Sequence, residues 1–171
     1  MPLLLTDGTE LLLRPIRPSD KVMLAAGHGR LSETTRLKRF LSAKPRLTST
    51  ELRYLTEVDG FDHYAVVAVD PRDPDNEIRA VARFVRDSVD PHTAEAAIVV
   101  CDELQGKGLG KHLARDLADA ARARGISRIR ASMLSDNPPA LALMQVIADR
   151  LTDGGHDHGV HEVVAELAAA A

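Results

Sequence analysis

Gln105-Gly106-Lys107-Gly108-Leu109-Gly110 is the stretch of this sequence that decides its fold. Its three glycines let neighbouring backbone N–H groups turn toward one point with no Cβ atom in the way. The stretch follows a strand-like segment over 96–100 and precedes a helix-like segment that reaches residue 124. Because N–H groups at the start of a helix favour an anion, we expect a loop that wraps a phosphate or pyrophosphate. A tight strand-to-helix turn that binds nothing is the alternative.

Two common phosphate-binding motifs do not fit this loop. A Walker A loop ends in Gly-Lys-Ser/Thr, whose hydroxyl binds Mg²⁺, whereas His112 follows Lys111 here. The dinucleotide fingerprint Gly-x-Gly-x-x-Gly does not match the spacing of Gly106, Gly108 and Gly110. The sequence therefore disfavours a magnesium nucleotide and a dinucleotide as the ligand.

Length and composition are those of one globular domain. The chain has 171 residues, of which 44% are hydrophobic and 27% are charged. No apolar run approaches the roughly 20 residues of a membrane span, and residues 1–7 lack the features of a secretory signal. The one cysteine, Cys101, is compatible with a reducing compartment, so we expect a cytoplasmic protein with no membrane partner. A net charge of −3 and 3% aromatic residues give no reason to expect nucleic acid as a partner.

Strand-like and helix-like segments alternate along the chain, which predicts a mixed α/β sheet. Leucines recur at 109, 113 and 117 and predict a helix directly after the glycine loop. Gly125 lies where glycine commonly ends a helix, and loop-forming residues over 70–76 predict a turn. We expect strands over 10–16, 63–69, 78–87, 93–100, 127–133 and 160–167, and helices over 19–27, 33–41, 48–58, 108–124 and 137–147.

The glycine loop resembles that of a known family. Gln105, Gly108 and Gly110 fit the pattern Gln/Arg-x-x-Gly-x-Gly/Ala, which resembles the acetyl-coenzyme A loop of the GNAT N-acetyltransferases. The expected order of strands and helices is also similar to the GNAT fold over nearly the whole chain. Segments over 13–20, 31–40 and 52–63 are similar to bacterial Pat-type protein lysine acetyltransferase domains. The resemblance implies one GNAT domain over 1–171, with a mixed, mostly antiparallel, twisted sheet flanked by helices and with splayed central strands.

The resemblance also implies a set of residues that bind acetyl-CoA. The apolar tripeptide Ile98, Val99 and Val100 would align the pantetheine arm with freed backbone groups. Asn137 would touch the cofactor at the start of the last helix, although the residue is equally a simple helix N-cap. The glycine loop would hold the pyrophosphate through Gln105, Gly106, Lys107, Gly108, Leu109, Gly110 and Lys111.

Glu95 is the candidate catalytic base. It shares a strand face with Ala97 and Val99, where an unpaired buried carboxylate would be costly. In similar GNAT enzymes a Glu at this place draws a proton from the acceptor amine, often through water. A dry surrounding that raises the pKa of the base would suit this role. The alternative is an ordinary Glu on the solvent side of a strand.

The general acid is less well marked. Many GNAT enzymes carry a Tyr after the Asn that protonates the departing thiolate, whereas residues 141–145 offer none, since the two tyrosines are Tyr54 and Tyr64. Ser135 is the nearest hydroxyl and is the candidate acid, with water as the alternative. The missing Tyr supports a rival hypothesis, a catalytically weak module that binds acyl-CoA as a sensor or partner domain.

We expect no functional site at three other features of the sequence. The basic residues between 36 and 46 are expected to form a solvated helix face: Arg36, Lys38, Arg39, Lys44 and Arg46. His156, His158 and His161 lie among glycines that indicate a flexible turn, and we expect no metal site there. Cys101 is expected to be an inert, buried thiol.

The sequence thus predicts an N-acetyltransferase that moves an acetyl group from acetyl-CoA to a primary amine by direct attack. The acceptor is either a protein lysine or a small molecule, and no motif distinguishes the two. The partners we expect are an acyl-CoA donor and an amine acceptor, and a homodimer is left open.

Overall fold

The computed structural model describes residues 1–73, 75 and 77–167 of the chain. The strands that it describes form one eight-stranded sheet in the order β1-β2-β3-β4-β5-β6-β8-β7. Neighbouring strands are antiparallel except for β5 and β6, which run parallel. The strands are β1 (Pro2–Leu4), β2 (Glu10–Pro15), β3 (His63–Val69), β4 (Ile78–Arg86), β5 (Thr93–Val100), β6 (Arg128–Leu134), β7 (Arg150–Asp157) and β8 (Val160–Glu166).

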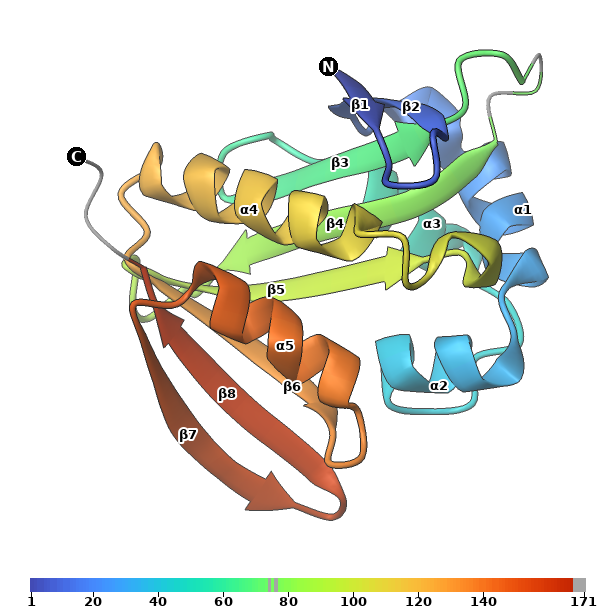
Figure 1. Cartoon of the computed structure of the whole chain (residues 1–171). Helices are drawn as coiled ribbons and strands as arrows, with labels where there is room; N and C mark the ends of the chain where they lie inside the picture. Colours follow the sequence, from blue (N-terminus) through green and yellow to red (C-terminus); the bar gives the residue numbers. More distant parts are fainter. Residues whose placement is uncertain (74, 76, 168–171) are drawn as a thin grey trace.

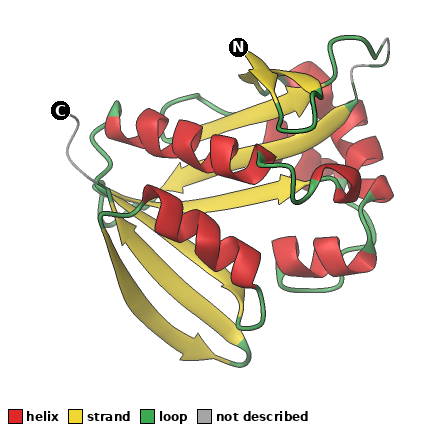
Figure 2. Ribbon diagram, in the orientation of Figure 1, coloured by secondary structure: helices red, strands yellow, loops and turns green. Residues whose placement is uncertain are grey.

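Helices lie on both faces of this sheet (Figures 1 and 2). Two helices, α4 and α5, cover the face that is in front in Figure 1, while α1 and α3 lie behind it. The α2 helix lies at the ends of β5 and β6 and contacts both strands. The α-helices are α1 (Lys21–Arg30), α2 (Glu33–Phe40), α3 (Ser49–Thr56), α4 (Leu109–Arg122) and α5 (Pro138–Ile147), with short 3-10 turns at Pro18–Asp20 and Asp102–Leu104.

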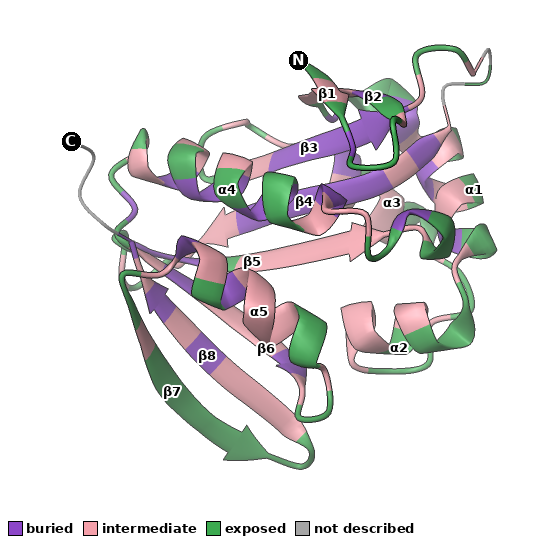
Figure 3. Ribbon diagram, viewed as in Figure 1, coloured by how far each residue is buried: buried purple, intermediate pink, exposed green. Residues whose placement is uncertain are grey.

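Each face of the sheet has its own hydrophobic core, because strand side chains alternate between the faces. In front, Leu109, Leu113 and Leu117 of α4 are at most 1% exposed and pack on Phe84 of β4. Behind, residues of α1 and α3 pack against the opposite side of β3, β4 and β5. Figure 3 shows β3 and β4 buried at the centre, whereas β7 is mostly exposed at one edge.

The predicted GNAT fold is confirmed, including its splayed central strands. The parallel pairing of β5 with β6 covers only three positions and ends at Glu95, opposite Arg130. On its other side β5 stays paired with β4 as far as Val100. The five residues Ala96–Val100 therefore have a strand neighbour on one side only, and a gap opens between β5 and β6.

Predicted elements agree with the structure within a few residues, with three exceptions. Two strands, β1 and β7, were not predicted from the sequence. Helix α1 continues past Gly27 to Arg30, because this glycine serves packing: a Cβ atom there would lie 3.1 Å from the Ile78 carbonyl of β4. The predicted turn over 70–76 includes residues 74 and 76, which lie outside the described residues, as do residues 168–171. Within the described part of the chain, no helix has the length and apolar character needed to cross a membrane.

Candidate active site

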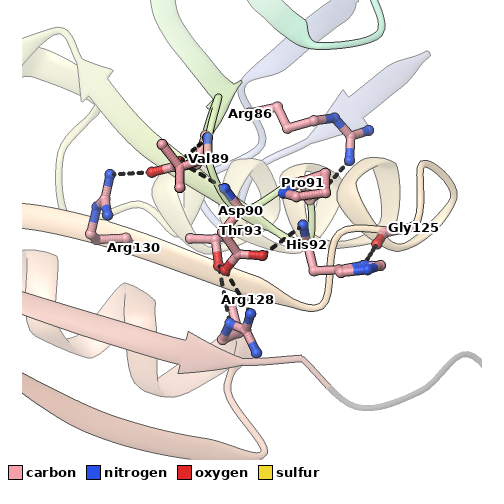
Figure 4. A network of polar contacts seen from close by, with 10 residues as sticks. Arg86, Val89, Asp90, Pro91, His92, Thr93, Gly125, Arg128 and Arg130 are labelled. Carbon is pink, nitrogen blue, oxygen red and sulfur yellow. Dashed lines mark hydrogen bonds and ion pairs between the residues drawn. The ribbon is translucent and has the colours of Figure 1, made fainter.

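A polar network joins β5 to β6 at the closed end of the gap (Figure 4). Arg128 donates to the Thr93 hydroxyl at 3.0 Å and pairs with Asp90 at 2.6 Å. Arg130 pairs with Asp87 at 3.1 Å. Hydrogen bonds from Thr93 and Arg128 lower the pKa of Asp90 to about 2, so this carboxylate is ionised at neutral pH. The network fixes the strands together where their pairing ends.

The open end of the gap is occupied by a cavity of about 770 Å³. Its walls come from β5, β6, α2, α4, α5 and the glycine loop. No acidic residue lines this cavity among the described residues, whereas Lys38, Arg39, Lys111 and Arg115 do. In a chain whose net charge is −3, such a lining favours an anionic ligand.

Backbone groups of β5 face this gap. The Cys101 N–H donates to the Arg79 carbonyl of β4 at 2.8 Å, so odd-numbered residues of β5 turn their backbone groups to β4. Ala96, Ile98 and Val100 therefore turn their N–H and C=O groups toward the gap. An extended ligand in the gap can pair with these groups as a strand would.

The glycine loop has the conformation that its sequence predicts. Gly106 and Gly108 have φ angles of +76° and +87°, a region that favours glycine. Gly108 is the N-cap of α4, and no side chain caps this helix. The Lys111 N–H of the first turn donates to the Gly108 carbonyl at 3.1 Å, which leaves the N–H groups of Leu109 and Gly110 to bind an anion in the cavity. Gly110 has a different use, because a Cβ atom there would lie 3.4 Å from Leu143 of α5.

Basic side chains surround this helix start. Lys111, His112 and Arg115 line the cavity, and the first turn of α4 holds no acidic residue. Cations at a helix N-terminus oppose the helix dipole, so a bound anion would relieve an unfavourable arrangement. Lys107 instead pairs with Asp7 at 2.9 Å, and the Leu109 side chain is fully buried in the core. Leu109 can therefore offer a ligand only its backbone.

Two further candidates for cofactor binding lie in the cavity wall. Asn137 occupies the N-cap position of α5, but its side chain makes no capping hydrogen bond and lines the cavity. Gln105 donates to the Val100 carbonyl at 3.1 Å and to the Thr35 hydroxyl at 3.2 Å. Gln105 thus connects the loop to both the end of β5 and the start of α2.

Asp102 has a structural role beside the cavity that the sequence did not reveal. Its carboxylate accepts hydrogen bonds from the Ser32 N–H and hydroxyl, at 3.0 and 2.7 Å, and from the Thr35 hydroxyl at 2.7 Å. Although burial opposes the charge, these bonds hold the pKa of Asp102 below its usual value. Asp102 therefore anchors α2 beside the cavity. The only local signal was a Ser and a Thr at a helix start, which are ordinary capping residues.

Glu95 lies at the point where β5 and β6 separate. It is exposed, so the dry surrounding expected from the sequence is absent. Glu95 faces the same side of the sheet as Val99, which packs with α1 and α3. Its carboxylate therefore lies on the sheet face opposite to α4, and Glu95 is not among the residues that line the cavity, which along β5 begin at the next residue, Ala96.

Arg39 and Arg83 lie near Glu95 on the same face. The Arg39 guanidinium lies 4.8 Å from the Phe40 ring centroid and is turned into the cavity wall, which contradicts the expectation of a solvated basic face at this position. Arg83 of β4 is 5% exposed and donates to the Leu55 carbonyl and to His63 Nε2, each at 3.0 Å. Burial and the Arg83 charge lower the pKa of His63 to about 4, so the imidazole is neutral at pH 7.

Ser135 is not brought to the cavity. Its hydroxyl donates to the Gly159 carbonyl at 3.1 Å, beside the turn between β7 and β8. That turn was expected to be flexible, yet residues 150–157 form β7. The hairpin brings together possible metal ligands from Asp153, His156 and His161, whose ligand atoms lie within 4.8 Å of one another. His158 pairs with Asp157 instead.

Cys101 lies beside the loop and is half-buried. Burial, together with the neighbouring Glu103, raises the pKa of its thiol to about 11. The thiolate is the reactive form, so this environment disfavours chemistry at Cys101.

Comparisons with known proteins agree with this geometry. A family model described as the acetyltransferase (GNAT) family matches residues 33–146. The chain is 35% identical over 155 residues to acetyltransferase Pat of Mycolicibacterium smegmatis, with 88% of this chain and 43% of Pat covered. It is 30% identical over 125 residues to acetyltransferase PA5475 of Pseudomonas aeruginosa, with 73% and 67% covered. The crystal structure of the GNAT domain of S. lividans PAT is similar with a TM-score of 0.85, 26% identity, and 98% and 96% of the two chains covered. This chain therefore spans less than half the length of the M. smegmatis relative.

Proposed function

The chain belongs to the GNAT acetyltransferase family, and from this premise we propose that it transfers an acetyl group from acetyl-CoA to a primary amine by direct attack. The observation that carries the proposal is the cavity between β5 and β6. It combines an open strand edge, an uncapped helix start and a basic lining without acidic residues among those described.

The donor fits this cavity by its chemistry. The pyrophosphate of acetyl-CoA would accept hydrogen bonds from the N–H groups of residues 106–110, and Lys111 and Arg115 would add positive charge. The pantetheine arm would lie in the gap and pair with the backbone of Ile98 and Val100. Asn137 would contact the arm from the other wall. The thioester would then lie near the point where the strands separate.

The reaction follows from this placement. Glu95 takes a proton from the acceptor ammonium through water, because only the neutral amine attacks a thioester. The neutral amine nitrogen then bonds to the carbonyl carbon and becomes positively charged. The carbon–sulfur bond breaks, CoA leaves as the thiolate, and the nitrogen loses its second proton to water. Since Ser135 lies away from the cavity, we assign protonation of the thiolate to water. The acceptor is a small amine or a protein lysine, the second being what the resemblance of residues 13–20, 31–40 and 52–63 to Pat-type domains implies.

Glu95→Gln tests the base. We expect kcat/KM at neutral pH to fall about 10²- to 10⁴-fold, the usual contribution of a general base, while the affinity for acetyl-CoA is unchanged. Release of the CoA thiol is measured with a panel of amines and proteins, and binding is measured by calorimetry. Glu10→Gln on the exposed end of β2 is the matched control.

Unchanged turnover in Glu95→Gln would remove this residue from the mechanism. Binding of acetyl-CoA by the wild-type protein with no transfer to any acceptor would instead favour the rival function, a module that senses acyl-CoA.

A further inference from the structure

Resting on the proposed function, we propose that Arg39 and Arg83 form a carboxylate-binding subsite, and that the acceptor is a primary amine that carries a carboxylate. The glycine loop indicates the donor and leaves the acceptor side of the proposed active site undefined. The proposed subsite assigns the acceptor a chemical class.

The first observation is the placement of Arg39 along α2. The start of α2 lies at the glycine loop, where Thr35 contacts both Gln105 and Asp102. Arg39 lies one helical turn further on, and there the Glu95 charge acts on it. Arg39 therefore lies at the reacting end of the cavity, away from the residues that would hold the pyrophosphate.

The second observation is that Arg39 lines two cavities. Besides lining the large cavity, it lines a smaller one of about 50 Å³ between α1, α2, α3 and the sheet. Arg83 lines this smaller cavity too, and its other lining residues are mainly apolar. The smaller cavity thus brings together guanidinium groups from α2 and from β4, and the Arg39 group also faces the large cavity.

The third observation is an imbalance of charge. Among the described residues, neither guanidinium has a carboxylate within ion-pair distance, and Glu95 is the acid that acts on Arg39. Burial, reinforced by the Arg39 charge, lowers the pKa of Arg83 to about 10, a sign that two cations share this region. His63 is neutral and adds no charge beside Arg83. The two guanidinium groups therefore outnumber the one carboxylate, and a ligand carboxylate would offset the excess positive charge.

A carboxylate is the group that this arrangement would recognise best. A guanidinium presents a planar set of N–H donors that matches both oxygens of a carboxylate. The subsite is on the same sheet face as Glu95, so a carboxylate held there would place the amine of the same molecule near the base. A lysine-rich peptide without an acidic group would be repelled.

The test compares amino acids with their amides, which differ only in the charged group. The substrates are glycine, β-alanine, 4-aminobutyrate and 5-aminopentanoate, each against its carboxamide, with acetyl-CoA as the donor. We expect at least one acid to be preferred over its amide by about 10- to 100-fold in kcat/KM, which is the range of a charge-assisted hydrogen bond. Arg39→Gln should reduce that preference to about threefold or less, because the rate with the acid falls more than the rate with the carboxamide.

Two control variants separate recognition from folding. Arg46→Gln removes the same charge from an exposed residue beyond α2 and should keep the preference. Arg39→Lys keeps the positive charge without the planar set of N–H donors, and should keep part of the preference for the acid over the amide. If Arg39→Gln lowered the rates of acids and amides equally, Arg39 would have only a structural role and the proposal would be wrong.

A binding measurement makes the result independent of turnover. With CoA present, calorimetry compares the N-acetylated acid with its N-acetylated amide, so the subsite is tested even if the proposed catalysis fails. Equal affinities for the two compounds would overturn the proposal. A further comparison uses succinyl-CoA and acetyl-CoA with a neutral amine. If the Arg39-dependent preference followed the donor carboxylate, the subsite would belong to the acyl group and the proposal for the acceptor would be wrong.

Discussion

At the scale of single residues, the backbone conformation of Gly108 determines where the anion-binding N–H groups point. Its φ angle of +87° lets the loop turn into α4 so that the N–H groups of the first turn face the cavity. A β-branched residue is rarely found in this region because its side chain collides with the backbone. Gly125, at the other end of the same helix, has a φ angle of +76° and lines neither cavity.

These two glycines give a matched prediction. Gly108→Val and Gly125→Val should each destabilise the fold by about 1–2 kcal/mol, because each substitution forces a valine into the left-handed backbone conformation that the glycine adopts. Only Gly108→Val should weaken acetyl-CoA binding, by about 100-fold, since several hydrogen bonds to the pyrophosphate are misaligned together. Thermal denaturation and calorimetry measure the two effects. Equal affinity in the two variants would show that the loop does not hold the donor.

At the scale of elements, the β5–β6 junction determines where the gap begins. The network of Asp90, Thr93 and Arg128 joins the strands just before they separate. Because its carboxylate is stabilised in the folded state, the pKa of Asp90 is lower there than in the unfolded chain. Asp90 therefore stabilises the fold above a pH of about 4, the usual pKa of Asp, and this contribution is lost as the pH falls toward about 2.

Asp90→Asn tests this junction. We expect a lower melting temperature than that of the wild type at pH 7, and the difference should shrink as the pH falls from about 4 toward 2. Glu57→Gln, which breaks the surface pair with Lys21, should have a smaller effect at pH 7, because such pairs contribute little. A difference between Asp90→Asn and wild type that does not change with pH would argue against this role for Asp90.

Local patterns were enough to predict the central elements. The β5 strand over 93–100 was predicted with its observed bounds, because its residues favour a strand and turn residues precede it. Helix α4 followed from its leucine spacing and the glycine before it. The edge strand β7 was not predicted, since its sequence includes Gly154 and Gly155 and its side chains are mostly exposed, so no apolar alternation marks it.

The candidate site was predictable only in part, because only some of its residues are marked by a local sequence pattern. The loop and β5 are continuous in sequence, so their residues could be assigned together. The contact between Asp102 and Ser32 joins residues 70 positions apart, and no local pattern encodes it. The inward turn of Arg39 depends on how α2 packs at the ends of β5 and β6, which is a property of the tertiary structure. Sequence therefore pointed to the proposed donor half of the site and to Glu95, and missed Arg39 and Arg83 in the proposed acceptor half.

At the scale of the whole molecule, the sheet divides the site into two sides. The helices α4 and α5 cover the face beside which the donor would bind, whereas Glu95, Arg39 and Arg83 lie toward the other face. The gap between β5 and β6 connects them. The central claim is that acetyl-CoA occupies this gap and pairs with the free edge of β5.

Amide hydrogen exchange, followed residue by residue by NMR, tests that claim most directly. Adding acetyl-CoA should slow the exchange of the N–H groups of Ile98 and Val100, which face the gap. The N–H groups of Ala97 and Val99 are already paired with β4 and should change little. We therefore expect protection that alternates along β5. Uniform protection along β5, or none at saturating acetyl-CoA, would contradict it.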